Sequence, residues 1–363
     1  MSKVLLIGGT GPTGPFIVNG LLSMGHTVTV LHRGNHEVPY DQEIEHIHTD
    51  PHFAGPLTAA LHGRSFDTVV ATYGRVRLFP EILRGKTERL VTVGGATYQA
   101  LESRAAAETD LKITGLKLYD KMNETEDVLI AGHKAGWYSL THLRYPNIYG
   151  PRQLAPTDWS IIRRIRDGRR RLLVVDGGLM LRSRAYAGNA AHVVLLAVQQ
   201  PQASAGEFFN VADSASPSEA DRVRKIAAVL GAQVELVSVP SSVKLPAHYP
   251  GISRSMRVKG IGEPRSEHEL LSIAKAEKLL GYVAPWGIDA AIEATVKWYQ
   301  ENPLPPGGEV ETTLGDPFNY EAEDQLLAQY DQFTGQLDTS AMGSEYRHPY
   351  AHPKEAAAAT PAN

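Results

Sequence analysis

Cysteine is absent from the 363-residue sequence, which excludes disulfides, thiolate metal sites and cysteine nucleophiles together. Apolar runs close to the roughly 20 residues that cross a bilayer are absent as well. The amino terminus lacks the layout of a signal peptide, because only four apolar residues precede the first glycines. A net charge of -4 gives no basic excess for nucleic acid or for an acidic membrane surface. We therefore expect a cytoplasmic protein with neither kind of partner.

Metal-ligand spacing is also missing from the sequence. Its 14 histidines are scattered along the chain. His348 and His352 stand four residues apart, but Pro349 and Pro353 would break any helix that aligned them. The sequence therefore predicts no metal site.

A glycine-rich turn between a strand and a helix is the first feature that is present. The apolar run 4–7 is typical of a buried parallel strand, and 16–24 has the apolar spacing of a helix. Between them, GGTGPTG at 8–14 would allow a tight turn and bring a pyrophosphate to the amino terminus of the helix. The alternative is a turn without a ligand. The candidate phosphate contacts are Gly8, Thr10, Gly11, Pro12, Thr13 and Gly14.

The second predicted strand, 27–31, is followed by His32 and Arg33. A carboxylate at this position would hold the ribose hydroxyls of adenosine, whereas an arginine can pair with a 2′-phosphate. The sequence thus favours NADP(H) over NAD, with a solvated arginine at a strand end as the alternative. Two further cofactor contacts are expected at the ends of later strands, Asp50 and Thr72.

Four more strands are predicted at 44–48, 67–72, 89–93 and 137–144. Their alternation with helical segments indicates an α/β protein with a Rossmann-like, doubly wound parallel sheet. In such a sheet ligands bind at the carboxyl ends of the strands, where the glycine turn and Arg33 also lie.

Several separated motifs resemble those of one enzyme family. They are VLLIGGTGPTG at the amino terminus, DTVVAT at 67–72, LRYPNIYGPRQ at 143–153, FFNVAD at 208–213 and AKAEKLLGYVAPWGIDAAIEATVKWYQEN at 274–302. Together they resemble the extended short-chain dehydrogenase/reductase superfamily, in particular its NAD(P)-dependent sugar epimerase/dehydratase type. The resemblance covers about residues 3–303.

The resemblance implies a division of the chain into three parts. Residues 1–150 and about 185–212 would form the NADP-binding Rossmann domain, in which Asn147 contacts the cofactor. A smaller substrate-binding region would consist of about 151–184 and 213–303. Residues 304–363 would be an extra carboxyl-terminal extension, and its low-complexity end from 354 is expected to be mobile.

The superfamily's chemistry uses a serine or threonine, a tyrosine, and a lysine four residues after the tyrosine. In this chain Gly94-Gly95 stands where a serine pair is usual, and Thr97 is the nearest hydroxyl. Tyr119 follows Thr97 at a distance compatible with that of the superfamily's tyrosine, but Asn123 occupies the position of the lysine. We expect Tyr119, Thr97 and Asn123 to form the catalytic set, with packing of Tyr119 as the alternative.

The missing lysine changes the expected reaction. Asparagine could still bind a ribose hydroxyl, but it supplies no positive charge to stabilise a tyrosinate. A reduction, in which neutral Tyr119 donates its proton to a developing oxyanion, is less affected than an oxidation that needs Tyr119 as a base.

Two arginine features add weaker expectations. Arg182 lies in the region where sugar-nucleotide members of the family place a phosphate-binding arginine, so it is a candidate substrate contact. The arginines between 163 and 171 form a basic cluster, which we interpret as a solvated helix end rather than an anion site.

Three functions are compatible with these features. The sequence favours an NADP(H)-dependent oxidoreductase that reduces a carbonyl or related unsaturated group of a small organic substrate. The alternatives are a sugar-nucleotide epimerase or dehydratase, and a non-redox NADP-binding regulatory or scaffold protein. The family resemblance also implies a homodimer as one assembly.

Overall fold

The computed structural model describes residues 2–99, 101, 104–261 and 265–343. His348, His352 and the low-complexity end from 354 lie outside these residues. The chain divides into two compact units, one reaching to Pro317 and the other beginning at Phe318. No helix within the described ranges is long and apolar enough to cross a membrane.

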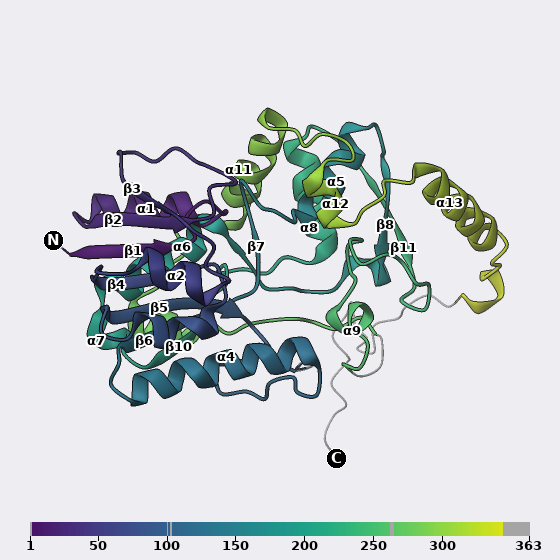
Figure 1. The fold of residues 1–363 in the computed structure, drawn as a ribbon. Coiled ribbons are helices and arrows are strands. Elements are labelled where there is room, and N and C mark those ends of the chain that lie inside the picture. Colours follow the sequence, from purple (N-terminus) through teal and green to yellow (C-terminus); the bar gives the residue numbers. More distant parts are fainter. Residues whose placement is uncertain (1, 100, 102–103, 262–264, 344–363) are drawn as a thin grey trace, which may run out of the picture. The chain divides into compact units, whose positions relative to one another are not determined.

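The first unit contains a seven-stranded parallel sheet with the strand order β10-β6-β5-β4-β1-β2-β3 (Figure 1). The order reverses between β1 and β4, as in a doubly wound fold. The predicted Rossmann-like sheet is confirmed. Its strands are β1 (Lys3–Ile7), β2 (Thr27–His32), β3 (Glu45–His48), β4 (Phe66–Ala71), β5 (Thr87–Gly95), β6 (Ser139–Tyr145) and β10 (Glu207–Asn210).

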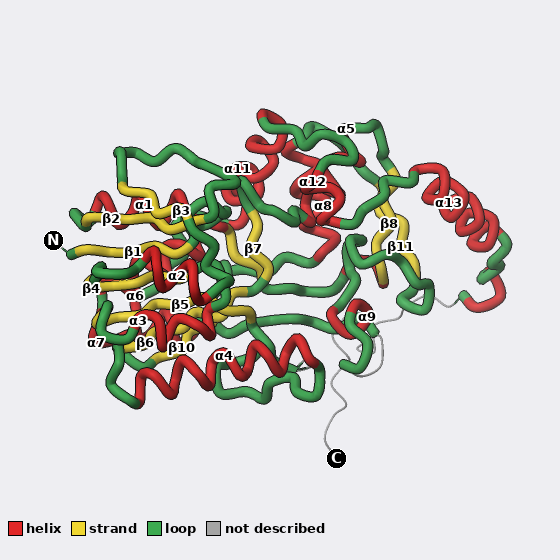
Figure 2. Tube along the Cα trace, in the orientation of Figure 1, coloured by secondary structure: helices red, strands yellow, loops and turns green. Residues whose placement is uncertain are grey.

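Helices cover both faces of this sheet (Figure 2). Alternate residues of β1 and β2, such as Leu6 and Val30, pack with α1 (Gly14–Ser23) and α6 (Ala187–Gln199). The opposite residues, such as Leu5 and Leu31, pack in the same apolar cluster as side chains of the other helical layer. That layer consists of α2 (Ala54–Ala60), η1 (Val76–Leu78), α3 (Phe79–Leu83) and α4 (Lys117–Lys134).

The remaining elements of the first unit follow β6. Two small parallel sheets pair β7 (Asn147–Tyr149) with β9 (Arg184–Tyr186) and β8 (Arg171–Val175) with β11 (Glu235–Val239). The helices are α5 (Thr157–Arg166), η2 (Asp176–Gly178), α7 (Pro201–Ser204), α8 (Glu219–Val229), α9 (Arg254–Arg257), α10 (Ala274–Leu280), α11 (Ile288–Glu301) and α12 (Glu309–Leu314). The second unit contains α13 (Tyr320–Gly335) and η3 (Ser340–Met342).

Ion pairs join α12 and the residues after it to α5. Arg163 Nη1 lies 2.6 Å from Glu311 Oε2, and Arg164 Nη1 lies 2.5 Å from Asp316 Oδ2. Trp159 Nε1 also donates a hydrogen bond to Glu311. The interpretation of the arginine cluster as a solvated helix end is therefore wrong for Arg163 and Arg164. These contacts fix residues 309–316 to the body of the first unit.

Candidate active site

The glycine turn between β1 and α1 has the geometry of a phosphate cradle. A Cβ on Gly14 would lie 1.7 Å from the Gly9 carbonyl oxygen, so any side chain there would separate the helix from the turn. Gly8 has a φ of +121°, which L side chains rarely adopt. A Cβ on Gly11, by contrast, would meet no atom within 4 Å, so the backbone there is open to a ligand.

The amino terminus of α1 is also left unsatisfied by protein side chains. Thr13 occupies the cap position without a side-chain cap hydrogen bond, and the first turn holds no acidic residue. The Gly14 N–H donates to the Gly11 carbonyl and Pro15 has no N–H, so the helix dipole is the main feature that favours an anion there. Thr10 and Pro12 belong to the same turn. This set of residues therefore fits the pyrophosphate of a dinucleotide.

The ends of β2, β3 and β4 gather the residues expected near adenosine. Arg33 is exposed, and its guanidinium carbon lies 5.5 Å from the ring centre of Tyr73. Asp50 accepts a hydrogen bond from the backbone N–H of His52, which holds the pKa of Asp50 below its usual range, with a small contribution from the charge of Arg33. The hydroxyl of Thr72 donates to the Ile7 carbonyl.

His32 points to a different environment from Arg33. Its Nε2 lies 2.8 Å from Nδ1 of His46, and its Nδ1 accepts a hydrogen bond from the backbone N–H of Gly34. Both ring nitrogens are therefore engaged within the protein. The His32 ring contacts His46 and His48, whereas the Tyr73 ring contacts His52 and Arg33.

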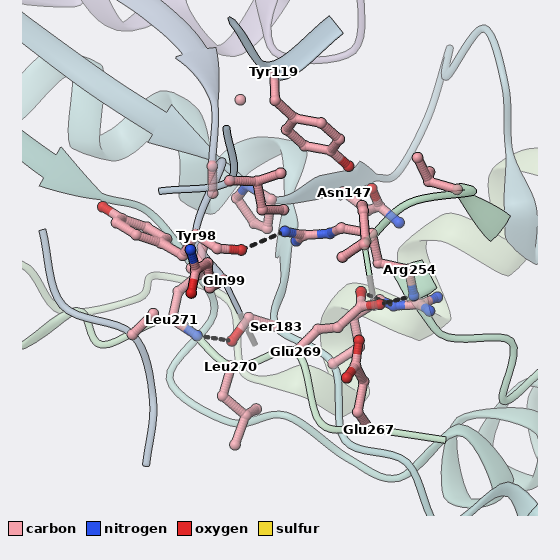
Figure 3. A pocket seen from close by; sticks show the side chains of 18 of the residues that line it. Tyr98, Gln99, Tyr119, Asn147, Ser183, Arg254, Glu267, Glu269, Leu270 and Leu271 are labelled. Carbon is pink, nitrogen blue, oxygen red and sulfur yellow. Dashed lines mark hydrogen bonds and ion pairs between the residues drawn. The ribbon is translucent and has the colours of Figure 1, made fainter. Parts of the chain in front are cut away.

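Tyr119 lines a cavity of about 400 Å³ at the carboxyl ends of β5 and β6. Its side chain projects from the first turn of α4 and is only 7% exposed. The phenol points into the cavity towards Asn147, which begins β7 (Figure 3). Two neighbours on α4, Leu118 and Met122, add apolar surface to the same wall.

Thr97 and Asn123 bind each other rather than projecting freely into the cavity. The Thr97 hydroxyl donates to Asn123 Oδ1 over 3.0 Å, and Asn123 Nδ2 donates to the Ile113 carbonyl over 2.9 Å. The backbone N–H of Ile113 in turn donates to the Thr97 carbonyl. Asn123 thus fastens the loop between β5 and α4 to the helix that carries Tyr119.

No lysine takes the place of the missing one among the described residues that line the Tyr119 cavity. The helix begins at Lys117, and both Lys117 and Lys121 are exposed. Lys121 instead lines a second cavity of about 320 Å³, together with Arg75 and Arg77. The regular start of α4 keeps Lys121 on a different face from Tyr119 and Asn123.

A buried ion pair anchors α4 behind the cavity. Arg144, on β6, donates two hydrogen bonds of 2.8 Å to the carboxylate of Glu126, and both residues are 4% exposed. Lys112 also pairs with Glu126. Burial alone would raise the pKa of Glu126, but the hydrogen bonds and charge of Arg144 outweigh it and leave that pKa below its usual range. Arg144 also donates to the hydroxyl of Tyr98 in the cavity wall.

Three arginines line the opposite side of the cavity: Arg182, Arg254 and Arg257. Glu269 accepts a hydrogen bond from Arg182 Nε at 2.9 Å and lies 3.6 Å from Arg257 Nη2. Arg254 Nη1 donates to the Tyr98 carbonyl (Figure 3). Burial, followed by the charge of Arg182, lowers the pKa of Arg257 to about 10. The cavity lining thus holds three arginines against two glutamates, Glu267 and Glu269.

Of these cavity residues, the sequence predicted Arg182, Tyr119 and Asn147. It missed Arg254, Arg257 and Glu269, which lie in loops and a single helical turn far along the chain. The only available signal was the pair of arginines three residues apart in SRSMR at 253–257.

Asn189, in the first turn of α6, joins three segments of the chain through its side-chain amide. Its Nδ2 donates to Asp213 and to the Trp286 carbonyl, and its Oδ1 accepts from the Trp286 backbone N–H. Asp213 also accepts from the hydroxyl of Tyr149. The amide thus joins α6 to the segments after β10 and α10.

Comparison with models of protein families shows which family this chain belongs to. Residues 4–212 match the model of the NAD dependent epimerase/dehydratase family, a span that includes the glycine turn, Tyr119 and Arg182. The chain belongs to this family. Its membership confirms the resemblance to the extended short-chain dehydrogenase/reductase superfamily and indicates a nicotinamide-dinucleotide-dependent enzyme. A comparison with curated protein sequences gave no match.

Solved structures of epimerases and dehydratases share the fold. UDP-glucose 4-epimerase from Thermotoga maritima, solved with UDP-glucose, is 17% identical with a TM-score of 0.67, covering 83% of this chain and 99% of the epimerase. The dTDP-glucose 4,6-dehydratase of Streptomyces venezuelae, solved with NAD, is 19% identical with a TM-score of 0.64, covering 83% and 97%. An epimerase from Methanothermobacter thermautotrophicus is 17% identical with a TM-score of 0.67, covering 83% and 93%.

Proposed function

We propose that this family member is an epimerase or dehydratase of a sugar nucleotide, with the reacting sugar beside Tyr119. Family membership supports this reaction class better than simple carbonyl reduction. The observation that carries the proposal is the cavity itself, which is lined by the Tyr119 phenol together with the guanidinium groups of Arg254 and Arg257. The Thermotoga maritima epimerase was solved with UDP-glucose, and the Streptomyces venezuelae dehydratase was solved with NAD and a second ligand.

The chain's own residues can bind and orient such a substrate. Arg254 and Arg257 would hold its phosphates, since guanidinium groups form charge-assisted hydrogen bonds to phosphate oxygens. The Tyr119 hydroxyl would move a proton to or from the sugar oxygen. A bound dinucleotide cofactor would supply hydride transfer through its nicotinamide ring. The open glycine turn and the uncapped amino terminus of α1 would hold the pyrophosphate of that cofactor.

Carbonyl reduction is a second candidate, and one specific observation favours it. Asn123 is committed to Thr97 and Ile113, and no lysine among the described residues lines the cavity. The site therefore lacks a fixed lysine charge that would stabilise a tyrosinate during oxidation. A reduction uses the proton that neutral Tyr119 already carries.

Product analysis separates the candidate functions. The purified chain is incubated with NAD(P)⁺ or NADPH and a panel of UDP- and dTDP-hexoses, and the products are identified by NMR. The proposal predicts an isomerised or dehydrated sugar with no net change in cofactor. Net NADPH consumption with a reduced product would favour the second candidate. Tight cofactor binding without turnover on sugar nucleotides or on small carbonyl compounds would support a regulatory or scaffold protein instead.

For cofactor choice we propose NADP(H), held through its 2′-phosphate by Arg33. Replacing Arg33 with alanine is expected to weaken NADPH binding by about 10- to 100-fold, the value of a hydrogen bond to a charged group. NADH binding should change little, because NADH has no 2′-phosphate. Dissociation constants from nicotinamide fluorescence provide the measurement. Arg64→Ala is the control, since Arg64 pairs with Glu45 at the surface. Equal weakening of both cofactors in Arg33→Ala would reject this choice.

A further inference from the structure

Three histidines that are separate in sequence meet across the edge of the sheet. His32 ends β2, while His46 and His48 lie two residues apart on β3, so their side chains share one face. The parallel register places His32 directly opposite His48 and Val30 opposite His46. One ring nitrogen from each histidine lies within 4.8 Å of the other two. Across the described part of the chain this is the only such group of three or more metal-ligating side chains.

We propose that His32, His46 and His48 form a structural binding site for a divalent transition metal of the zinc type. Three imidazoles are a common zinc ligand set, with a fourth position left for water or a carboxylate. At zinc–nitrogen bonds of about 2.0–2.1 Å, tetrahedral ligands lie roughly 3.4 Å apart. The His32 Nε2 to His46 Nδ1 separation of 2.8 Å needs only a slight opening.

The charge around the group suits a dication. Glu37 brings a carboxylate oxygen to 3.5 Å from His48 Nε2. This carboxylate is placed to complete the ligand set or to orient the His48 ring.

An ion can reach the group from solvent, and binding it at His32 would cost one hydrogen bond within the protein. The His48 side chain is 52% exposed, so an ion can reach the group from solvent, whereas His32 is 3% exposed and fixed in place. The Gly34 N–H donates to His32 Nδ1, which puts the proton of the neutral ring on Nε2, the atom facing His46. Metal binding at Nε2 would move that proton to Nδ1 and release the Gly34 contact.

Such a site would join the edge strand β3 to β2 next to the segment that carries Arg33. A metal ion there would raise the stability of the fold without taking part in hydride transfer, because none of the three histidines lines the Tyr119 cavity. The inference therefore requires neither the proposed substrate nor the proposed cofactor. Sequence spacing alone did not predict this site, because the three histidines converge only through the pairing of β2 with β3.

The test uses the full chain without a histidine tag, stripped with a chelator and titrated with Zn²⁺ by calorimetry and with Co²⁺ by visible absorption. The proposal predicts one equivalent of metal, a tetrahedral Co²⁺ spectrum, and a Zn²⁺-dependent rise in the thermal unfolding midpoint. His46→Ala and His48→Ala should each weaken binding by at least about 10- to 100-fold, the loss that even outer-shell changes produce. His36→Ala is the matched control, because His36 is an exposed histidine in the following loop and outside the group.

Three results would overturn the site. The first is failure of the wild-type chain to bind an equivalent of either ion. The second is equal affinity in wild type, His46→Ala and His48→Ala. The third is an equal loss of affinity in His36→Ala, which would place the metal elsewhere. Thermal unfolding of each metal-free variant distinguishes lost ligation from lost folding, because a folded variant retains a cooperative transition.

Discussion

Replacing Tyr119 with phenylalanine is expected to lower turnover by about 10²- to 10⁴-fold, the range that a positioned proton-transfer group contributes. The change removes one oxygen from a buried ring that already packs beside Leu118 and Met122, so the cavity keeps its shape. Binding of cofactor and substrate should therefore remain close to that of the wild type. The loss should appear in kcat more than in KM, because the proton moves only as the sugar reacts.

Steady-state kinetics on the active sugar nucleotide, with separate cofactor titrations, measure this effect. Tyr138→Phe is the matched control, because the Tyr138 hydroxyl donates to the Leu129 carbonyl and does not line the cavity. It should leave kcat nearly unchanged. If Tyr119→Phe also retains full turnover, the phenol is not the proton-transfer group, and Tyr119 only packs against its neighbours.

Replacing Glu126 with alanine is expected to destabilise the protein by about 3–5 kcal/mol, the cost of leaving a buried charge without its partner. Arg144 would lose both of its 2.8 Å hydrogen bonds to the carboxylate while remaining on a buried strand. Lys112 would lose the same partner. Because a typical domain is stable by only about 5–15 kcal/mol, much of the margin would disappear.

Urea denaturation followed by circular dichroism measures this loss. Glu293→Ala is the control, since Glu293 and Lys297 form an exposed pair one helical turn apart. That exposed pair is screened by solvent, so its loss should change the stability very little. The native pKa of Glu126 lies below its usual value, so its stabilisation is complete above about pH 4.3 and fades as the pH falls through the native pKa. Equal losses in the two variants would contradict the role of the buried pair.

The sheet was predictable because its signals are local. Short apolar runs and glycines define β1, β2 and the turn between β1 and α1, and each of these lies within about ten residues of sequence. Tyr119 lines the candidate cavity, at a distance from β5 that the sequence spacing allowed, and its catalytic role stays a prediction.

Other parts of the site depend on contacts between distant segments. Arg254 and Arg257 reach the cavity from a short helical turn more than 100 residues after Tyr119, and no periodic pattern marks that turn. The hydrogen bond between Thr97 and Asn123 could not be read from spacing, because it depends on how the loop after β5 returns to α4. Sequence reasoning treated Asn123 as a substitute for a lysine, whereas its amide holds that loop in place.

The most direct test of the central claim is a crystal structure of the chain with NADP⁺ bound. We expect the pyrophosphate at the amino terminus of α1, the 2′-phosphate beside Arg33, and the nicotinamide in the cavity next to the Tyr119 hydroxyl. A reacting carbon would then fit about 3–3.5 Å from the nicotinamide. Asn123 should keep its hydrogen bonds to Thr97 and Ile113. A nicotinamide bound away from Tyr119, or a cofactor whose pyrophosphate does not contact the glycine turn, would contradict the proposed cofactor site and the proposed role of Tyr119.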